Sequence, residues 1–298
     1  MAKTNIDCGK IENKVKSLQQ KLGTDNRNIA IAKSAMTRDQ LPYFQSWYTE
    51  YVSHFYSQEH DQEQQWAIKL KDEHSQRVRE EVIVISHGLD LPEQDIMLAE
   101  VLGLFHDIGR FYQYRKYGTF RDDLSENHAE LGVKEISDAS ILSALSYEEK
   151  EIIKKGILYH NLHKLPEDEE PRCLFFCKLL RDADKLDIWR VVIDYYQNEQ
   201  DHNPHVALEL GLQDTPGYSQ EILDDLYSRQ TSSAGCVKNL NDYKLLQIGW
   251  VYDINFSPTF QEIKNREYLQ KIARRLPETP ESKKVLATAE KYVALHAT

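Results

Sequence analysis

Apolar residues recur at steps of three and four along almost the whole chain, which is the spacing that builds one face of an α-helix. The first clear example runs from Leu41 to Tyr56, where aromatic residues supply most of the apolar face. Further helical patterns cover residues 62–86, 92–108, 126–137, 147–163, 170–198, 219–229, 237–254, 258–275 and 281–296. No segment shows a convincing period-two alternation over the length of a strand. The sequence therefore predicts an all-α protein built as a multi-helix bundle.

Proline and glycine punctuate these patterns, with Leu-Pro at 91–92 and Thr-Pro-Gly at 215–217,. We expect a helical core over residues 61–200. Residues 1–60 would form an N-terminal helical appendage, and residues 201–298 would form C-terminal helices that pack on the core. The aromatic faces of these flanking helices fit either a cover for the bundle or a homodimer contact, because both would bury the same residues.

The charge balance limits the partners of the chain. With 37 Lys and Arg residues against 48 Asp and Glu residues, the formal net charge is −11 at pH 7. Proteins that hold duplex nucleic acid by its phosphates need a basic face, so we expect no duplex nucleic acid as a partner. A small anionic substrate remains compatible with this charge, because bound metal ions can invert the charge inside one pocket.

The first residues, MAKTNIDCGKIENKVK, contain no apolar core and no cleavage signature, so we expect no signal peptide,. The longest apolar stretch, residues 96–108, is interrupted by charged residues and is too short to span a bilayer,. Four cysteines do not make a disulfide scaffold in a chain of this size, and we expect Cys173 and Cys177 to pack in the core,. Together these features predict a cytoplasmic protein without a membrane partner.

Side chains of the types that bind metals are expected to point into the bundle. His74, for example, lies on the helical line of Leu70 and Val78, so its ring points inward with the aliphatic residues,. A single inward histidine is usually a core residue that bonds to a backbone carbonyl. Six inward groups from five helices are hard to satisfy in that way, whereas a metal centre satisfies them together. The six residues are His74, His106, Asp107, His128, His160 and Asp184.

The adjacent pair His106–Asp107 carries geometric information. Neighbours on a helix lie about 100° apart around its axis, so both can serve one site only at a helix end. We expect Gly109 to end this helix. There the Asp107 carboxylate could reach sideways between two ions, which two-metal sites hold about 3.5–4 Å apart. The pair therefore favours Asp107 as a bridging ligand.

Part of this set resembles a known family. His74, the pair His106–Asp107 within FHDIGR and Asp184 within DADKLD are similar to the H…HD…D signature of the HD superfamily of metal-dependent phosphohydrolases. The resemblance implies an all-α bundle of the HD-domain type, with extra N- and C-terminal helices in this chain. The expected core over residues 61–200 then becomes an HD-type metal-binding core.

The remaining two histidines resemble the additional ligands of the binuclear branch of this superfamily. They are His128 in NHAELG and His160 in LYHNLH, and the whole resemblance spans residues 74–190. The branch includes the HD-GYP cyclic-dinucleotide phosphodiesterases and the symmetrical diadenosine tetraphosphate hydrolases. The GYP tripeptide is absent after His160, so cyclic-di-GMP does not carry over as the substrate.

The resemblance implies one or two divalent metal ions, whether Mn, Fe, Ni, Mg or Zn. One ion would be held by His74, His106, Asp107 and Asp184, and the other by Asp107, His128 and His160. Asp182 competes with Asp184 for the last position. Because Lys178 and Lys185 lie on its helical line, we expect Asp182 to form surface ion pairs,. Asp187 shares the face of Asp184 and is expected to support the ligands.

This site predicts a phosphohydrolase that cleaves a small phosphate ester or anhydride, with a nucleotide as the favoured substrate. A metal can lower the pKa of bound water to about 7, so a hydroxide bridging the ions at Asp107 would attack phosphorus in line. Lys185 and His163 are the candidates for protonating the leaving group.

Several cations and aromatic residues could bind this substrate. Arg110 follows HDIG directly, at a position that is Lys in much of the HD-GYP branch, and Arg77 lies one helical turn beyond His74. Tyr114 and Arg115 belong to the segment RFYQYRKYGTFRDD, whose aromatic and basic residues could stack a base and hold its phosphate,. The alternative interpretation, which we favour, is a loop whose aromatic residues anchor it to the bundle.

Two other functions fit the same residues. Some HD-fold enzymes with a similar ligand pattern use a di-iron centre to oxidise a small substrate with O₂, and histidine and carboxylate bind iron as readily as manganese. A non-catalytic regulator that binds a nucleotide would also use this cavity, but it would be expected to have lost ligands.

Overall fold

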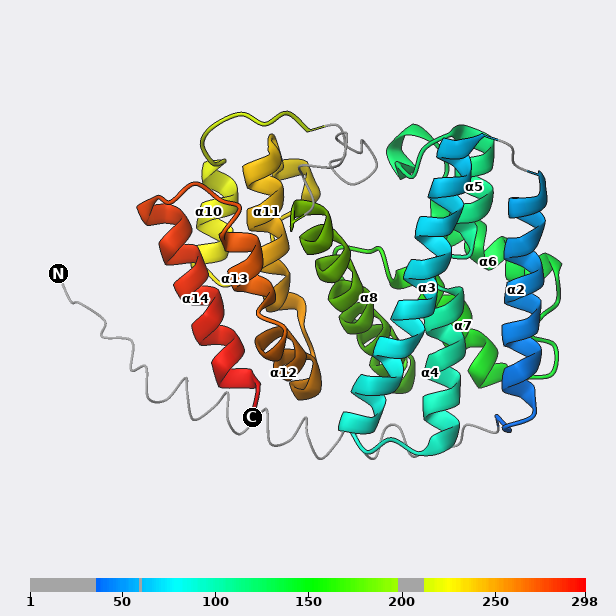
Figure 1. The fold of residues 1–298 in the computed structure, drawn as a ribbon. Coiled ribbons are helices and arrows are strands. Elements are labelled where there is room, and N and C mark those ends of the chain that lie inside the picture. Colours follow the sequence, from blue (N-terminus) through cyan, green and yellow to red (C-terminus); the bar gives the residue numbers. More distant parts are fainter. Residues whose placement is uncertain (1–35, 59–60, 198–211) are drawn as a thin grey trace.

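The fold is described from a computed structural model for residues 36–58, 61–197 and 212–298 (Figure 1). Within these residues the secondary structure is helical and contains no strand, which confirms the predicted all-α bundle. The α-helices are α2 (Gln40–Gln58), α3 (Gln62–Gly88), α4 (Glu93–Phe105), α5 (Gly109–Tyr117), α6 (His128–Asp138), α7 (Tyr147–Tyr159), α8 (Pro171–Gln197), α10 (Gln220–Tyr227), α11 (Leu240–Gly249), α12 (Ser257–Asn265), α13 (Tyr268–Ala273) and α14 (Pro280–His296). Short 3₁₀ turns are η1 (Asp122–Leu124), η2 (Ala234–Cys236) and η3 (Trp250–Asp253).

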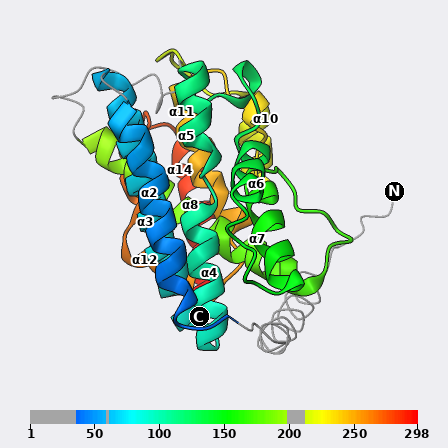
Figure 2. The same ribbon diagram turned by 90° about the vertical axis from the view of Figure 1, so that its right-hand side faces the viewer.

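The long helix α8 joins the two halves of the molecule. On one side it packs against α3, α4 and α7, and on the other it packs against α12 and α13 (Figures 1 and 2). Helix α4 is buried almost all round, because it also contacts α2, α3 and α7. Its sequence EQDIMLAEVLGLF is apolar on nearly every face, as a central helix requires,.

Side-chain caps define where several helices of the core begin. The Asp61 carboxylate accepts from the backbone N–H groups of Glu63 and Gln64 at the start of α3. Asn127 caps α6 in the same manner, and Ser146 forms a capping box at the start of α7,. The cap at Asn127 makes His128 the first residue of α6, so the position of this histidine is set by the helix start.

Two predictions about the segment after His106 were wrong. Residues 109–117 form the helix α5 rather than a loop, and Gly109 begins this helix instead of ending the previous one. His106 and Ile108 keep right-handed helical backbone angles, so the chain turns directly from α4 into α5. Gly109 is required for a different reason: a Cβ there would lie 2.1 Å from the carbonyl oxygen of His128. The missing side chain lets α5 and α6 approach closely.

The helix expected over residues 258–275 is two helices, α12 and α13. The break lies at Glu267, whose φ of 54° is in the left-handed region and ends the α-helical hydrogen bonding,. Beside it, the Arg266 guanidinium pairs with Glu81 of α3 and with Glu262. The pair of Arg266 and Glu81 therefore links the C-terminal helices to α3. The helical periodicity of the sequence does not predict this long-range contact.

The prediction that Asp182 is a surface residue was also wrong. Its side chain is fully buried and accepts hydrogen bonds from the backbone N–H groups of Asn255 and Phe256 and from the Asn255 side chain. Burial raises the pKa of Asp182 to about 6, against these hydrogen bonds, which lower it,. The face of α8 that carries Asp182 and the buried Trp189 is covered by the C-terminal helices, so it is an internal surface.

Some expectations fall on parts of the chain that are not described. Residues 1–35 of the expected appendage and residues 198–211, which contain the start of the expected C-terminal part, lie outside the described residues. Every helix within the described part is too short or too polar to cross a membrane. Cys173 and Cys177 are buried in the core, as expected.

The contact at Gly109 leads to a stability prediction. Replacing Gly109 by alanine should lower the free energy of unfolding by about 3 kcal/mol, because the new methyl group would meet backbone atoms that cannot move aside,. Gly235→Ala is the matched control, since its Cβ would meet nothing closer than 3.7 Å, and it should stay within about 1 kcal/mol of wild type,. Urea unfolding followed by circular dichroism measures both; equal midpoints would contradict the close contact.

Candidate metal centre

The six predicted ligands converge from three helices and from the residues that directly follow two others. His74 comes from α3, His106 and Asp107 follow α4, His128 begins α6, His160 follows α7 and Asp184 lies on α8. Five of the six are buried, and the Asp184 side chain is 15% exposed. Within the described residues they fall into two groups whose potential ligand atoms lie within 4.8 Å of one another. The first group is His74, His106 and Asp184, and the second is Asp107, His128 and His160.

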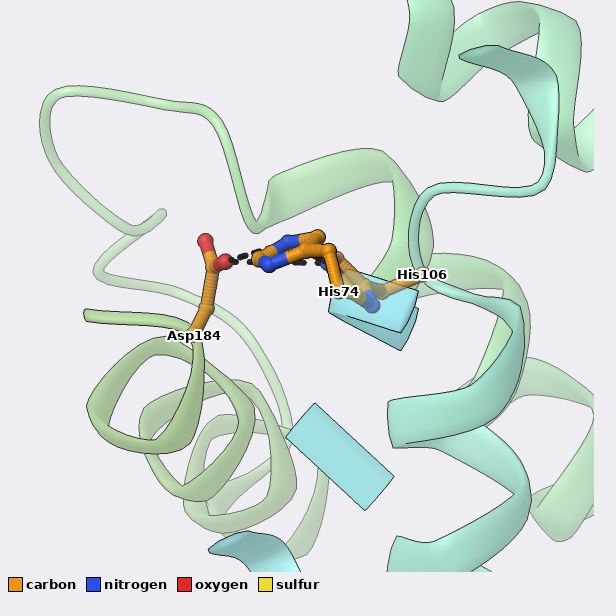
Figure 3. Close-up of side chains that lie close together, drawn as sticks. All are labelled: His74, His106 and Asp184. Carbon is orange, nitrogen blue, oxygen red and sulfur yellow. Dashed lines mark hydrogen bonds and ion pairs between the residues drawn. The ribbon is translucent and has the colours of Figure 1, made fainter. Parts of the chain in front are cut away.

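In the first group, the Nε2 atoms of the two histidines lie close to each other and to the Asp184 carboxylate (Figure 3). Nε2 of His74 lies 3.2 Å from Nε2 of His106 and 3.1 Å from Oδ1 of Asp184. The same carboxylate oxygen lies 3.6 Å from Nε2 of His106. Three ligand atoms thus face one small space, as a tetrahedral or octahedral cation needs.

The second group repeats this arrangement with a different carboxylate. Nε2 of His128 lies 3.0 Å from Nε2 of His160. Oδ1 of Asp107 lies 3.5 Å from the first of these nitrogens and 3.6 Å from the second.

The Asp107 carboxylate faces both groups at once. While its Oδ1 faces the second group, its Oδ2 lies 3.6 Å from Nε2 of His74 and 3.8 Å from Nε2 of His106. One oxygen for each group is the geometry of a carboxylate that bridges two ions, as predicted for an acid at the end of α4.

In each of the four histidines of the two groups, the Nδ1 atom donates a hydrogen bond to an oxygen. The Nδ1 atoms of His106 and His160 donate to the carbonyl oxygens of Gly103 and Ile157 at 2.8 and 2.6 Å. The Nδ1 atoms of the other two histidines donate to carboxylates, at 2.7 Å in both cases; the pairs are His74 with Asp187 and His128 with Asp122. Each group therefore has one histidine supported by a carboxylate and one supported by a carbonyl.

This pattern tests whether the residues fit a metal. A neutral histidine that donates from Nδ1 presents a lone pair at Nε2. In the neutral rings two such lone pairs face each other at 3.2 and 3.0 Å, an arrangement that is relieved by a proton or a metal ion between the nitrogens. Carboxylates and carbonyls behind metal-binding histidines hold the ring in the tautomer that binds metal. The donor set fits two divalent ions.

The two groups of three residues together form what we call the cage, and the charges in this cage support the fit. Burial raises the pKa of the Asp107 carboxyl. The positive charges of Lys71, His106 and Arg110 outweigh this effect and hold the pKa of Asp107 well below its usual range. Burial likewise raises the pKa of Asp184, but hydrogen bonds from His106 and His74 lower it well below its ordinary value. Both carboxylates are thus in the ionised form that binds metals.

The two carboxylate-supported histidines differ in their affinity for a proton. Burial lowers the pKa of His74, but hydrogen bonds to Asp184 and Asp187 outweigh this effect and raise the pKa to about 9. Burial and the positive charge of Arg110 lower the pKa of His128 to about 3. The first group therefore attracts positive charge strongly, while His128 stays neutral and available as a ligand.

Groups outside the cage hold the supporting carboxylates. Arg77 binds Asp187 through Nε at 2.5 Å and Nη2 at 3.1 Å. Asp122 accepts from Arg110 and Gln113 as well as from His128. The supporting position expected for Asp187 agrees with this contact. Asp122 was missed by sequence reasoning, because it lies outside any periodic segment and carries no motif.

Arg181 is a second residue that sequence reasoning missed. Its Nη1 donates to the carbonyl oxygens of His160, at 3.2 Å, and of Leu162, and its Nη2 donates to Asp253 at 2.6 Å. The guanidinium therefore holds the end of α7 that carries His160, and it links that end to η3 in the C-terminal part.

The residues predicted to bind the substrate or to donate a proton differ in the groups that they contact. Arg110 reaches the cage, with Nε 3.4 Å from Oδ1 of Asp107. Arg77 binds Asp187, and the Arg115 guanidinium lies 4.5 Å from the ring centre of Phe55 on α2. Tyr114 is buried against Phe120, the Lys185 ammonium lies 2.7 Å from Asp253, and His163 is exposed. Sequence reasoning missed Lys71, whose Nζ lies 2.8 Å from Oδ2 of Asp107.

Comparison with known proteins gives one match. Residues 71–189 match the family model of the HD domain, and all six residues of the cage lie within this range. Searches of curated proteins and of solved structures found no match.

The second group predicts a selective loss of metal. His128→Ala should leave one bound ion per chain where wild type binds two, because only the second group loses a ligand,. Elemental analysis of protein loaded with Mn²⁺ and freed of excess metal measures the ratio. His87→Ala, which removes an exposed histidine of α3, should keep the wild-type ratio. An unchanged ratio in His128→Ala would mean that this histidine only packs in the core.

The support of His128 predicts a weaker, graded effect. Asp122→Ala should lower the affinity of the second ion about 10- to 100-fold, since the ring would lose the group that fixes its tautomer,. Titration with Mn²⁺ followed by calorimetry measures this change. Asp123→Ala is the control, because the neighbouring Asp123 is exposed and pairs with Arg121. Equal affinities in both variants would show that Asp122 does not support the ligand.

Proposed function

We propose that this chain, which carries an HD domain over residues 71–189, is a binuclear metal-dependent phosphohydrolase. Its substrate would be a small phosphate ester or anhydride, and we favour a nucleotide. One observation carries the proposal. The Asp107 carboxylate directs one oxygen to the histidines of each group, so two ions would share this single ligand,.

The charge of the loaded site favours an anionic substrate. Two divalent ions would bring four positive charges, whereas Asp107 and Asp184 supply two negative ones. Lys71 and Arg110 both lie beside Asp107 and add further positive charge. The excess of positive charge supports a phosphate as the group bound there, in a chain whose formal net charge is −11,.

In the proposed reaction, ions bound at the two groups would lower the pKa of a water molecule and offset the charge on the phosphoryl oxygens. The oxygen of that water forms a bond to phosphorus as the bond to the leaving oxygen breaks, and the leaving oxygen keeps the electron pair. The leaving oxygen also takes up a proton. We assign this proton to Lys185 rather than His163, because Lys185 directly follows Asp184 in the sequence and its side chain is only 12% exposed, whereas His163 is exposed.

An aromatic ring beside the cations supports a nucleotide. The ring of Phe120 lies 5.3 Å from Nζ of Lys71 and 5.8 Å from the guanidinium carbon of Arg110. Tyr114 also packs against this ring, with a centroid distance of 4.6 Å. A base stacks on such a ring while its phosphate meets the cations.

The second candidate is a di-iron oxygenase. The observation in its favour is the donor set itself, four imidazoles and two carboxylates, which binds iron as well as manganese,. The lysine and arginine beside Asp107 favour hydrolysis over oxidation, because an oxygenase does not need cations to neutralise a phosphoryl group.

One experiment separates the two candidates. Purified protein is loaded with Mn²⁺ or, anaerobically, with Fe²⁺, and its metal content is measured. The manganese form is screened for phosphate release from nucleotides, dinucleotides and sugar phosphates, and the iron form is tested for O₂ consumption with the same compounds. Phosphate release without O₂ uptake is the expected result. Substrate-dependent O₂ uptake without phosphate release would favour the oxygenase.

The bridging role of Asp107 leads to the strongest activity prediction. Asp107→Ala should lose both ions and at least about 10³-fold in turnover while its helical content stays unchanged, because the shared ligand is removed,. Elemental analysis, the phosphate-release assay and circular dichroism measure these quantities. The exposed Asp138 at the end of α6 provides the control Asp138→Ala, which should behave as wild type. Full metal occupancy in Asp107→Ala would rule out the binuclear centre.

A further inference from the structure

We infer that Lys71 binds the phosphoryl group of the substrate. This inference rests on the proposed function, and it assigns a role to a residue that neither helical periodicity nor the family resemblance singled out. Lys71 lies on α3, one helical turn before His74, so both side chains leave the same face of the helix,. Its Nζ reaches Oδ2 of Asp107, the oxygen that faces the first group.

The side chain of Lys71 is more exposed than that of Asp107, the carboxylate that it binds. Its side chain is 18% exposed, whereas that of Asp107 is 4% exposed. The lysine therefore has its ammonium at the cage and part of its side chain in contact with solvent. A group in this position is accessible to a substrate that approaches the ions from outside.

The ammonium has hydrogen-bonding capacity to spare. A lysine carries three N–H donors, and Asp107 is its one hydrogen-bond acceptor among the described residues,. The ring of Phe120 lies 5.3 Å away and offers only a weaker cation–π contact,. Up to two donors remain for phosphoryl oxygens. An ionised carboxylate oxygen can accept from Lys71 and bind an ion together, because it has two lone pairs.

The other cations near the cage are already committed to acceptors of the chain. They are Arg77 with Asp187, Arg110 with Gln113, Asp122 and the Phe120 carbonyl, Arg181 with Asp253 and backbone carbonyls, and Lys185 with Asp253. Moving any of the three arginines to a substrate would break contacts that hold the supporting carboxylates or the end of α7. Binding a phosphate by Lys71 costs none of these contacts.

The test compares Lys71→Met with Lys69→Met. Methionine keeps the apolar stem of the lysine and removes its charge. Lys69 is on the same helix, but it is 65% exposed and pairs with Glu73. Both variants and wild type are loaded with Mn²⁺, and three quantities are measured: bound manganese, the dissociation constant for inorganic phosphate by calorimetry, and kcat/KM for the substrate found in the screen.

The expected result is normal manganese content in both variants, with phosphate binding and kcat/KM reduced about 10- to 100-fold in Lys71→Met only. Lys71→Arg, which keeps the charge, should retain more phosphate affinity than Lys71→Met. This third variant shows whether charge or packing matters if Lys71→Met is poorly folded.

The outcomes separate this inference from the proposed function. If wild type releases and binds phosphate and Lys71→Met does so equally well, the inference is wrong while the phosphohydrolase proposal stands. Loss of manganese from Lys71→Met would mean that the lysine supports the ligands instead, and it would also overturn the inference. If wild type neither binds nor releases phosphate, the proposed function fails and the role of Lys71 fails with it.

Discussion

The carboxylate of Asp107 is the constraint on which the rest of the core depends. Its two oxygens face two pairs of histidines, and these histidines come from four different helices. Such a position is available only in the turn where α4 ends, because a residue in the middle of a helix cannot face both sides. The close approach of α5 and α6 at Gly109 then brings His128 within reach of this turn.

A second layer holds the histidines from behind. Each ring donates from Nδ1 to an oxygen of the chain, so its Nε2 atom keeps one direction,. The carboxylates in this layer are themselves held by Arg77 and Arg110. Because the ions would meet groups that are already oriented, little conformational freedom is lost on binding. The arginines near the site thus act mainly on the protein itself.

Periodicity predicts what lies on a regular helix and little else. His74 could be placed from its apolar neighbours one turn away, and His106 and Asp107 from the expected end of their helix, although that helix ends at Phe105 and not at Gly109. The burial of Asp182 could not be predicted, because a segment more than seventy residues later covers it. The contact of Lys71 likewise depends on the packing of α3 against the end of α4.

The attachment of η3 to α8 has a consequence for the limits of the folded unit. Arg181 and Lys185 flank the ligand Asp184, and both bind Asp253, a residue beyond the segment that matches the family model. A fragment cut at residue 189 would leave these two cations without their counter-ion and would open the apolar face around Trp189 to water. The smallest segment of this chain that would fold on its own therefore includes the C-terminal helices, and a boundary drawn from family similarity alone would divide a continuous core.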